Sequence, residues 1–163
     1  MRAILLDALA AALPINAAAI DRGALTNALL SSLRFSAFPD VRPALQSWRA
    51  AGVRLVVVSN WDVSLHGVLE RLGIALLLEA ILTSAQAGVR KPAPAIFEQA
   101  LRLAGARAGD AVHVGDSLEE DVAGARAAGI EPILIARDGR AVRGAVRTIA
   151  TLDELRAGAF PDP

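Results

Sequence analysis

The chain has 163 residues, no net charge and 54% hydrophobic residues, a composition that indicates one compact domain with a buried core. Seventeen basic residues balance seventeen acidic ones without a block of either sign, so the charge pattern favours neither nucleic acid nor an anionic membrane surface as a partner. The absence of cysteine excludes a disulfide framework, a zinc-thiolate site and thiol catalysis. Lys91 is the only lysine beside sixteen arginines, and we expect chemistry there.

The N-terminal segment superficially resembles a secretory signal, with an early arginine followed by leucines and alanines. Asp7 interrupts its apolar run after four residues, and a carboxylate in so short a hydrophobic region is costly to insert into a membrane. We therefore predict a short buried strand over Ala3–Leu6 that ends on an acid. We also expect a soluble, cytoplasmic protein without a membrane span.

Beyond this segment, short β-branched runs alternate with longer alanine- and leucine-rich stretches, which predicts an α/β fold. The expected strands are Ala3–Leu6, Val53–Val58, Ala80–Thr83, Ala111–Val114, Ile130–Ile135 and Val146–Ile149. The expected helices are Asp40–Ala51, Trp61–Leu72, Ala93–Ala104, Leu118–Ala128 and Leu152–Ala157. Helix-ending glycines are expected at Gly52, Gly73, Gly105 and Gly129. Nearly uncharged strands favour a parallel sheet with helices on both faces, in a doubly wound sandwich.

The alanine-rich segment between Ala8 and Phe38 fits this alternation least well. It contains one plausible helix, Ala24–Leu33, whose leucines at positions 25, 29 and 33 share one stripe. Neither an internal repeat nor a low-complexity linker divides the sequence. We therefore expect residues 1–163 to form a single domain.

Polar residues stand at the carboxyl ends of four of the expected strands. They are Asp7, the pair Ser59 and Asn60, Lys91, and the run Gly115 to Ser117. Open α/β sheets bind ligands along this edge, so the pattern predicts one site. Each residue also has an ordinary explanation: Asp7 as a turn residue, Ser59 as the cap of a helix near Trp61, and Asp116 or Ser117 as the cap of the next helix.

Lys91 and Asp121 are harder to explain as structural residues. A chain that otherwise uses arginine would tolerate arginine at an ordinary solvated position, whereas a compact ammonium suits a carboxylate or phosphate in a tight space. Asp121 lies four residues after Ser117, so its carboxylate can reach back to the strand end. Together with Asp7 and Asp116, these groups suit phosphoryl transfer through an aspartyl intermediate with Mg²⁺. His113 lies inside an expected strand and is interpreted as a packed core residue.

Three segments resemble motifs of the haloacid dehalogenase superfamily: VVVSNWD (56–62), GVRKPAPAIFEQAL (88–101) and HVGDSLEEDVAGARAAG (113–129). The resemblance implies a Rossmann-like three-layer sandwich with Asp7 as the nucleophile. It implies that Ser59, Asn60 and Lys91 bind the phosphate. It also implies Mg²⁺ held by Asp7, Asp116 and the backbone carbonyl of Leu9, with Asp121 supporting.

The first motif departs from the family pattern. Members typically read Asp-x-Asp-Gly-Thr where this chain reads Asp7-Ala8-Leu9-Ala10-Ala11, so Leu9 replaces the usual general acid and base, a group typically worth about 10²–10⁴ in rate. Residues 8–38 are also shorter than the helical cap of related enzymes and are interpreted as a vestigial cap or crossover segment. Three explanations stay open: an open site for a large substrate, a homodimer through residues 24–34 that covers it, or an internally shortened chain.

The favoured hypothesis is a Mg²⁺-dependent phosphatase that acts on a small phosphorylated metabolite, with no nucleic acid or membrane partner. A catalytically silent domain with a binding role is the hypothesis from another class, and Leu9 and the short cap region support it. A 2-haloacid dehalogenase is the enzymatic alternative.

Overall fold

The computed structural model describes residues 21, 34–139 and 146–155. The chain divides into two compact units, Met1–Ser36 and Ala37–Pro163, and all the elements below belong to the second unit. The expected strand Ala3–Leu6, the helix Ala24–Leu33, and the site residues Asp7 and Leu9 lie outside the described residues. Their structure, and the proposed interface over residues 24–34, therefore stay predictions.

Five strands in the described residues, paired in parallel within their sheets, confirm the α/β prediction. They are β1 (Val56–Ser59), β2 (Ala80–Thr83), β3 (Val112–Gly115), β4 (Glu131–Ile135) and β5 (Arg147–Ile149). The β2 bounds are as predicted, and the ends of the other strands lie within three residues of their expected positions. The carboxyl ends of β1 and β3 bear the residues that the sequence analysis singled out, Ser59 and Gly115.

The strands form two sheets in the described part of the chain. One sheet pairs β1 with β2, where Val57 lies opposite Ile81. The other has the order β3-β4-β5, where Val114 lies opposite Ile133. Within the described residues, β1 pairs only with β2, and β3 pairs only with β4. Strands β1 and β3 therefore each keep an edge that no described strand occupies.

The helices largely follow the predicted pattern. They are α3 (Val41–Ala50), α4 (Leu65–Arg71), α5 (Ser84–Ala87), α6 (Pro94–Ala104) and α7 (Gly124–Ala127). Single 3₁₀ turns are η2 (Ala75–Leu77), η3 (Ala108–Asp110) and η5 (Leu152–Glu154). The glycines expected after helix ends, Gly52, Gly73, Gly105 and Gly129, all have positive φ. Left-handed backbone favours glycine there because it has no Cβ.

Three predicted helices differ from the structure. In the described part of the predicted helix Leu152–Ala157, the structure has only the single 3₁₀ turn η5, and Leu155 after it is extended. Helix α4 begins at Leu65 rather than Trp61, because the Asp62 carboxylate accepts the Ser64 N–H at 2.8 Å and forms a turn before the helix. The predicted helix Leu118–Ala128 is divided into a wide π-helical segment, η4 (Leu118–Ala123), and the short α7. Such wide turns often occur at functional sites.

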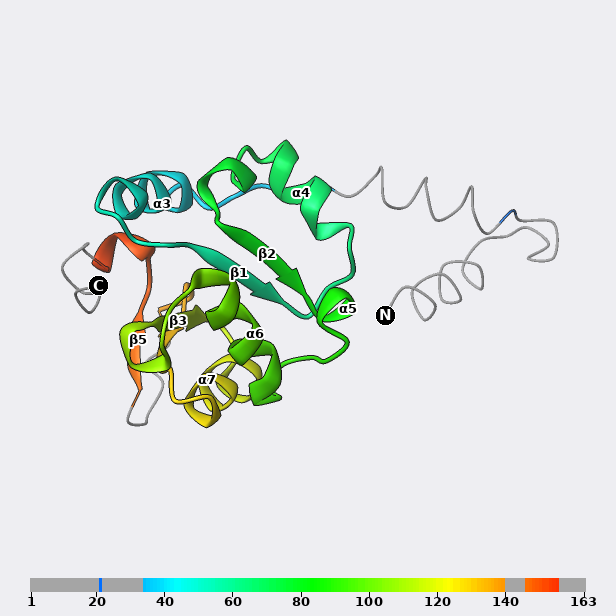
Figure 1. Cartoon of the computed structure of the whole chain (residues 1–163). Helices are drawn as coiled ribbons and strands as arrows, with labels where there is room; N and C mark the ends of the chain where they lie inside the picture. The colour runs from blue at the N-terminus through cyan, green and yellow to red at the C-terminus, as the bar shows by residue number, and fades with distance from the viewer. Residues whose placement is uncertain (1–20, 22–33, 140–145, 156–163) are drawn as a thin grey trace, which may run out of the picture. The chain divides into compact units, whose positions relative to one another are not determined.

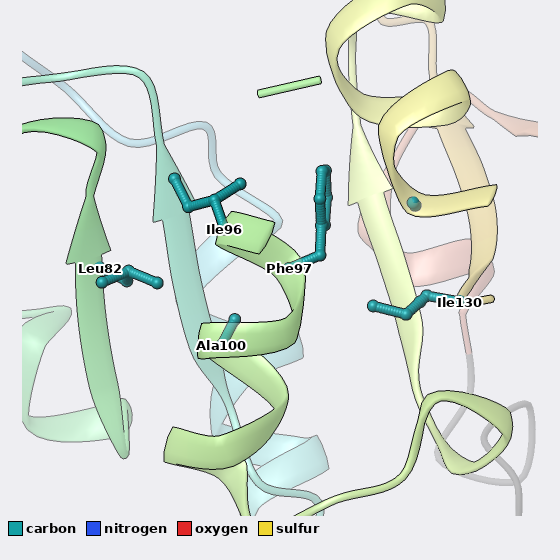
Figure 2. Packing of buried hydrophobic residues seen from close by; sticks show 6 residues of the cluster. Leu82, Ile96, Phe97, Ala100 and Ile130 are labelled. Atoms are coloured by element: carbon teal, nitrogen blue, oxygen red, sulfur yellow. The ribbon is translucent and has the colours of Figure 1, made fainter. Parts of the chain in front are cut away.

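Helices cover both faces of the strands (Figure 1). On one face, Ile96 and Phe97 of α6 are fully buried among Leu82, Ala125 and Ile130 (Figure 2). The close approach of α7 to this cluster requires Gly124, where a Cβ would lie 2.6 Å from Phe97 Cε2.

On the other face, Trp48 of α3 packs with Ile133, Ile149 and Leu155. Its indole N–H donates to the Leu155 carbonyl at 2.8 Å. Trp48 and Phe97 are therefore both core residues, 6% and 0% exposed. In the described ranges no helix combines the length and apolar character needed to cross a membrane.

Candidate active site

A cleft of about 930 Å³ lies at the carboxyl ends of β3 and β4. Its lining includes Lys91, Asp116 and Asp121, three of the predicted site residues. The side chains of Phe38 and Leu118 add exposed apolar surface to it. The cleft therefore combines a charged region with apolar lining, an arrangement suited to a small charged ligand.

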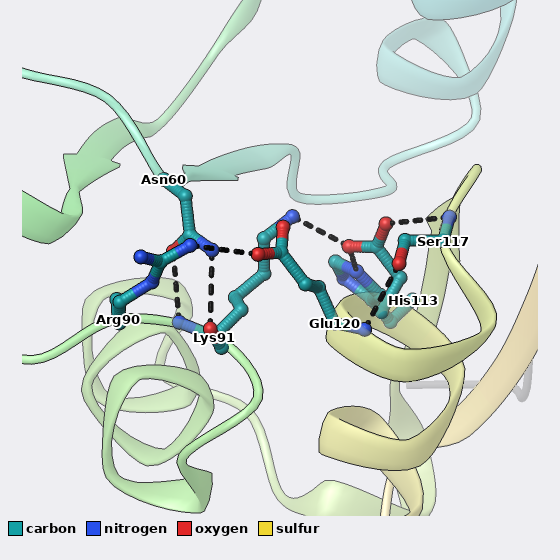
Figure 3. Close-up of polar contacts among 7 residues, drawn as sticks. Asn60, Arg90, Lys91, His113, Ser117 and Glu120 are labelled. Carbon is teal, nitrogen blue, oxygen red and sulfur yellow. Dashed lines mark hydrogen bonds and ion pairs between the residues drawn. The ribbon is translucent and has the colours of Figure 1, made fainter. Parts of the chain in front are cut away.

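Lys91 and Asp121 form a buried ion pair. The Lys91 ammonium donates to Asp121 Oδ1 at 2.5 Å, and the two side chains are only 11% and 4% exposed. Lys91 lies in the loop before α6 and Asp121 lies in η4, so the pair joins two segments that lie 30 residues apart in the sequence. The exposed pair Arg90–Glu120 joins the same two segments at 2.8 Å (Figure 3).

Three donors hold the Asp121 carboxylate. Besides Lys91, His113 Nε2 lies 2.8 Å from Oδ1, and the Ser117 N–H donates to Oδ2 at 3.1 Å. Burial by itself raises the pKa of Asp121, but the hydrogen bonds and charges of His113 and Lys91 outweigh burial and hold this pKa well below its usual range. Asp121 therefore acts as a fixed anion at the edge of the cleft.

Gly115 makes room for this carboxylate. A Cβ at position 115 would lie 2.1 Å from Asp121 Cγ, far inside van der Waals contact. The predicted reach of Asp121 back to the strand end is thus confirmed, and it depends on a residue without a side chain. Ser117 acts as the predicted cap, because its hydroxyl accepts the Glu120 N–H at 3.0 Å.

His113 was predicted to be a packed core residue, and the structure adds a polar role. Its ring packs edge to face with Phe97, with centroids 5.0 Å apart. His113 lies in β3, one of the strands that border the cleft, and its Nε2 atom contacts Asp121. The apolar residues on both sides of His113 in the sequence predict that its imidazole is buried. A buried imidazole requires a hydrogen-bond partner, so this pattern could have indicated the polar role.

Ser59 is the last residue of β1, and Asn60 follows it. The explanation of Ser59 as a helix cap is wrong, because α4 begins six residues later. The Asn60 side chain bonds the main chain of Lys91 on both sides: its Oδ1 accepts the Lys91 N–H at 2.8 Å and its Nδ2 donates to the Lys91 carbonyl at 3.1 Å. The Lys91–Pro92 peptide bond that follows is cis.

Asp116 is the described residue best suited to bind a metal. Its carboxylate is exposed on the cleft, and Mg²⁺ is commonly held by one or two carboxylates together with phosphate oxygens and water. Asp121 is less available, because both of its oxygens already accept hydrogen bonds. The described ranges contain no cluster of three or more potential ligands. A site built on Asp116 therefore needs donors from elsewhere in the chain or from the substrate.

A wall of the cleft contains an ion pair that the sequence analysis did not identify. Asp40 accepts from Arg137 at 3.0 and 3.1 Å and from the Leu152 N–H at 2.7 Å. Arg137 lies over the Phe38 ring, 3.9 Å from its centroid. Burial raises the pKa of Asp40, but the hydrogen bonds from Leu152 and Arg137 outweigh it and lower this pKa overall.

The structure brings most of the described site residues to one edge of the strands. Lys91, Asp116 and Asp121 line one cleft, and Asn60 connects the end of β1 to Lys91. Ser59 is adjacent to Asn60 at the end of β1. Asp7 and Leu9 lie outside the described residues.

Parts of this chain are similar to known proteins. A protein from Bos taurus named haloacid dehalogenase-like hydrolase domain-containing protein 3 is 42% identical to this chain over 92 residues. These residues are 56% of this chain and 37% of that protein. A ribulose-1,5-bisphosphate 5-phosphatase from Halopiger xanaduensis is 38% identical to this chain over 100 residues. The match covers 61% of this chain and 42% of that phosphatase. The chain thus spans less than half the length of these two relatives.

The fold is also found in solved structures. A HAD phosphatase from Thermococcus onnurineus superimposes with a TM-score of 0.73 and 28% identity, covering 83% of this chain and 63% of that one. The family model for haloacid dehalogenase-like hydrolases matches residues 4–129. This range includes every predicted site residue. The chain therefore belongs to the haloacid dehalogenase-like hydrolases.

Proposed function

We propose that the chain is a Mg²⁺-dependent phosphatase that acts on a small phosphorylated metabolite through an aspartyl-phosphate on Asp7. The observation that carries the proposal is the buried Lys91 ammonium, which is held by Asp121 at a cleft that Asp116 also lines. A fixed positive charge beside exposed carboxylate oxygen suits a transferring phosphoryl group, whose oxygens gain charge in the transition state.

The proposed chemistry has two steps. An oxygen of the Asp7 carboxylate attacks phosphorus while the ester oxygen of the substrate leaves with the electron pair of the broken P–O bond. Water then attacks the aspartyl-phosphate, releasing inorganic phosphate and restoring the carboxylate. Lys91 and Ser59 hold the phosphoryl oxygens, and Asn60 contributes by holding Lys91.

The proposal requires Asp7 to reach the cleft. The sequence pattern predicts that the strand Ala3–Leu6 ends on Asp7, as β1 ends on Ser59 and β3 on Gly115. In open parallel sheets the residues at such carboxyl ends contribute to one site.

A bound Mg²⁺ would supply positive charge to the phosphoryl oxygens. Asp116 fits this role because of its exposed carboxylate, and the proposal adds Asp7 and the Leu9 carbonyl. Asp121 supports the site through Lys91 rather than as a direct ligand, since both of its oxygens are hydrogen-bonded.

The replacement of the usual acid by Leu9 restricts the substrate. A leaving group that needs no protonation loses least from the missing acid, so activated phosphate esters are the best substrates under this proposal. The relative from Halopiger xanaduensis is a sugar bisphosphate phosphatase by name, which supports a small phosphorylated metabolite as the natural substrate class.

The proposal is tested by hydrolysis of p-nitrophenyl phosphate with Mg²⁺ or with a chelator. Turnover that requires Mg²⁺ and is lost in Asp7→Asn is expected. The matched control is Asp110→Asn, because Asp110 pairs with Arg107 on the surface before β3, and this variant keeps full activity. Absence of turnover in the parent protein favours the silent binding domain, and metal-independent release of halide from a 2-haloacid favours the dehalogenase.

A further inference from the structure

Asn60 uses both atoms of its side-chain amide on the main chain of one residue, Lys91 (Figure 3). The Lys91 N–H lies 2.8 Å from Oδ1, and the Lys91 carbonyl lies 3.1 Å from Nδ2. The two residues are 31 positions apart in the sequence. This pair therefore fixes the end of β1 to the loop before α6.

We propose that Asn60 is a positioning residue that determines where the Lys91 ammonium lies in the cleft. This inference rests on the proposed function. Lys91 is held at both ends, by Asn60 at its main chain and by Asp121 at Nζ. With its two ends fixed, a flexible four-carbon side chain keeps its ammonium in one place, which lowers the entropy cost of orienting it toward phosphate.

The contact requires a primary amide at position 60. An amide presents an acceptor and a donor side by side, which match an N–H and a C=O of the main chain. Aspartate has the same shape but offers only acceptors, so it would face the Lys91 carbonyl with a second oxygen. Leucine has a similar size and offers neither group.

This role differs from direct phosphate binding by the Asn60 side chain, the role that the family resemblance implies. Nδ2 donates one of its two hydrogens to the Lys91 carbonyl, and Oδ1, which accepts the Lys91 N–H, cannot donate to a phosphate oxygen. If Asn60 acts through Lys91, its replacement matters only while the ammonium is present. If it binds phosphate itself, its replacement also matters without the ammonium.

A double-mutant cycle with p-nitrophenyl phosphate separates these two roles. In the parent protein, Asn60→Leu is expected to lower kcat/KM about 10–100-fold, as expected for a displacement of about 1 Å at a reacting group. Asn60→Asp is expected to lie between Asn60→Leu and the parent protein. In a Lys91→Met background, Asn60→Leu is expected to change kcat/KM by less than about threefold, because the two effects are not independent. Equal losses in both backgrounds would overturn the proposal.

A second readout does not depend on activity. Lys91 is the only lysine in the sequence, so protein labelled with [¹⁵N]lysine gives a single lysine amide resonance. Hydrogen exchange of this amide is expected to be at least about tenfold faster in Asn60→Leu, because the N–H loses its acceptor. Val63→Ala, at a 60% exposed position of the same loop, is the control and leaves the resonance and its exchange unchanged.

The two readouts separate the failure of each idea. If neither the parent protein nor any variant hydrolyses p-nitrophenyl phosphate, but hydrogen exchange of the Lys91 amide is faster in Asn60→Leu, the proposed function fails and the contact between Asn60 and Lys91 is confirmed. If the amide exchanges equally fast in the parent protein and in Asn60→Leu, the positioning role fails whatever the activity. If Asn60→Leu does not fold, kcat/KM and the hydrogen exchange of the Lys91 amide are measured on Asn60→Asp instead.

Discussion

Replacing Lys91 with methionine removes the ammonium and keeps an unbranched side chain in a position where the lysine side chain is 11% exposed. Asp121, which is 4% exposed, then keeps hydrogen bonds only from His113 and Ser117. Removing one partner of a buried ion pair costs about 3–5 kcal/mol. Because two donors remain, we expect a loss of about 2–3 kcal/mol in the free energy of unfolding, which corresponds to about 4–12 °C in Tm for a chain of this size.

The activity of the same variant gives an independent measure. Loss of one fixed charge that stabilises a transition state costs about 10²–10³ in rate, so kcat/KM for an aryl phosphate is expected to fall by this factor. The double variant Lys91→Met/Asp121→Asn removes the unpaired carboxylate charge and is expected to regain most of the lost stability but none of the activity. Thermal unfolding and steady-state kinetics on the same preparations test both statements. If activity returns together with stability, the ammonium has only a structural role and our reasoning is refuted.

Variants at three further positions test the surroundings of the cleft. Gly115→Ala is expected to lower stability by about 1–3 kcal/mol, because its Cβ would overlap the Asp121 carboxylate; denaturant unfolding like that of the parent protein would contradict this. His113→Leu is expected to lower stability by about 1 kcal/mol more than His113→Gln, which keeps a donor, and equal unfolding midpoints would show that the hydrogen bond is unimportant. Asp40→Asn is expected to lose about 1–3 kcal/mol at neutral pH. Because the folded pKa of Asp40 is lowered, its stabilisation is present above the unfolded pKa of about 3.9 and is lost as pH falls through the folded pKa. The unfolding curves of Asp40→Asn and the parent protein should therefore converge in acid, and a constant difference would exclude this carboxylate as the cause.

Much of the fold could be predicted from local patterns. Uncharged β-branched runs predict buried parallel strands because both faces of such strands are covered. Glycines such as Gly105 and Gly129 mark helix ends because their backbone conformation is left-handed. The start of α4 was missed because the Asp62 carboxylate bonds the Ser64 N–H and closes a turn in place of the first helical turn. The apolar spacing after Trp61 does not reveal this contact.

The candidate site was predictable only in part. Lys91, Asp116 and Asp121 could be identified from the strand-loop pattern and from the rarity of lysine, and the structure places them on one cleft. The role of Asn60 could not, because its partner lies 31 residues away and any amide after a strand has several possible partners. His113 was interpreted as a core residue for the same reason: its partner is known only once η4 folds back on β3.

The wall formed by Asp40 and Arg137 has a consequence for the movement of the cleft. The Asp40 carboxylate joins residues that are 97 and 112 positions away in the sequence, Arg137 and Leu152. These contacts join three segments that are distant in the sequence, and the carboxylate that joins them is itself buried, 8% exposed. A change in the position of Arg137 at the cleft would therefore act on three segments at once: on Asp40 and Leu152 through the carboxylate, and on Phe38 through the ring that Arg137 covers.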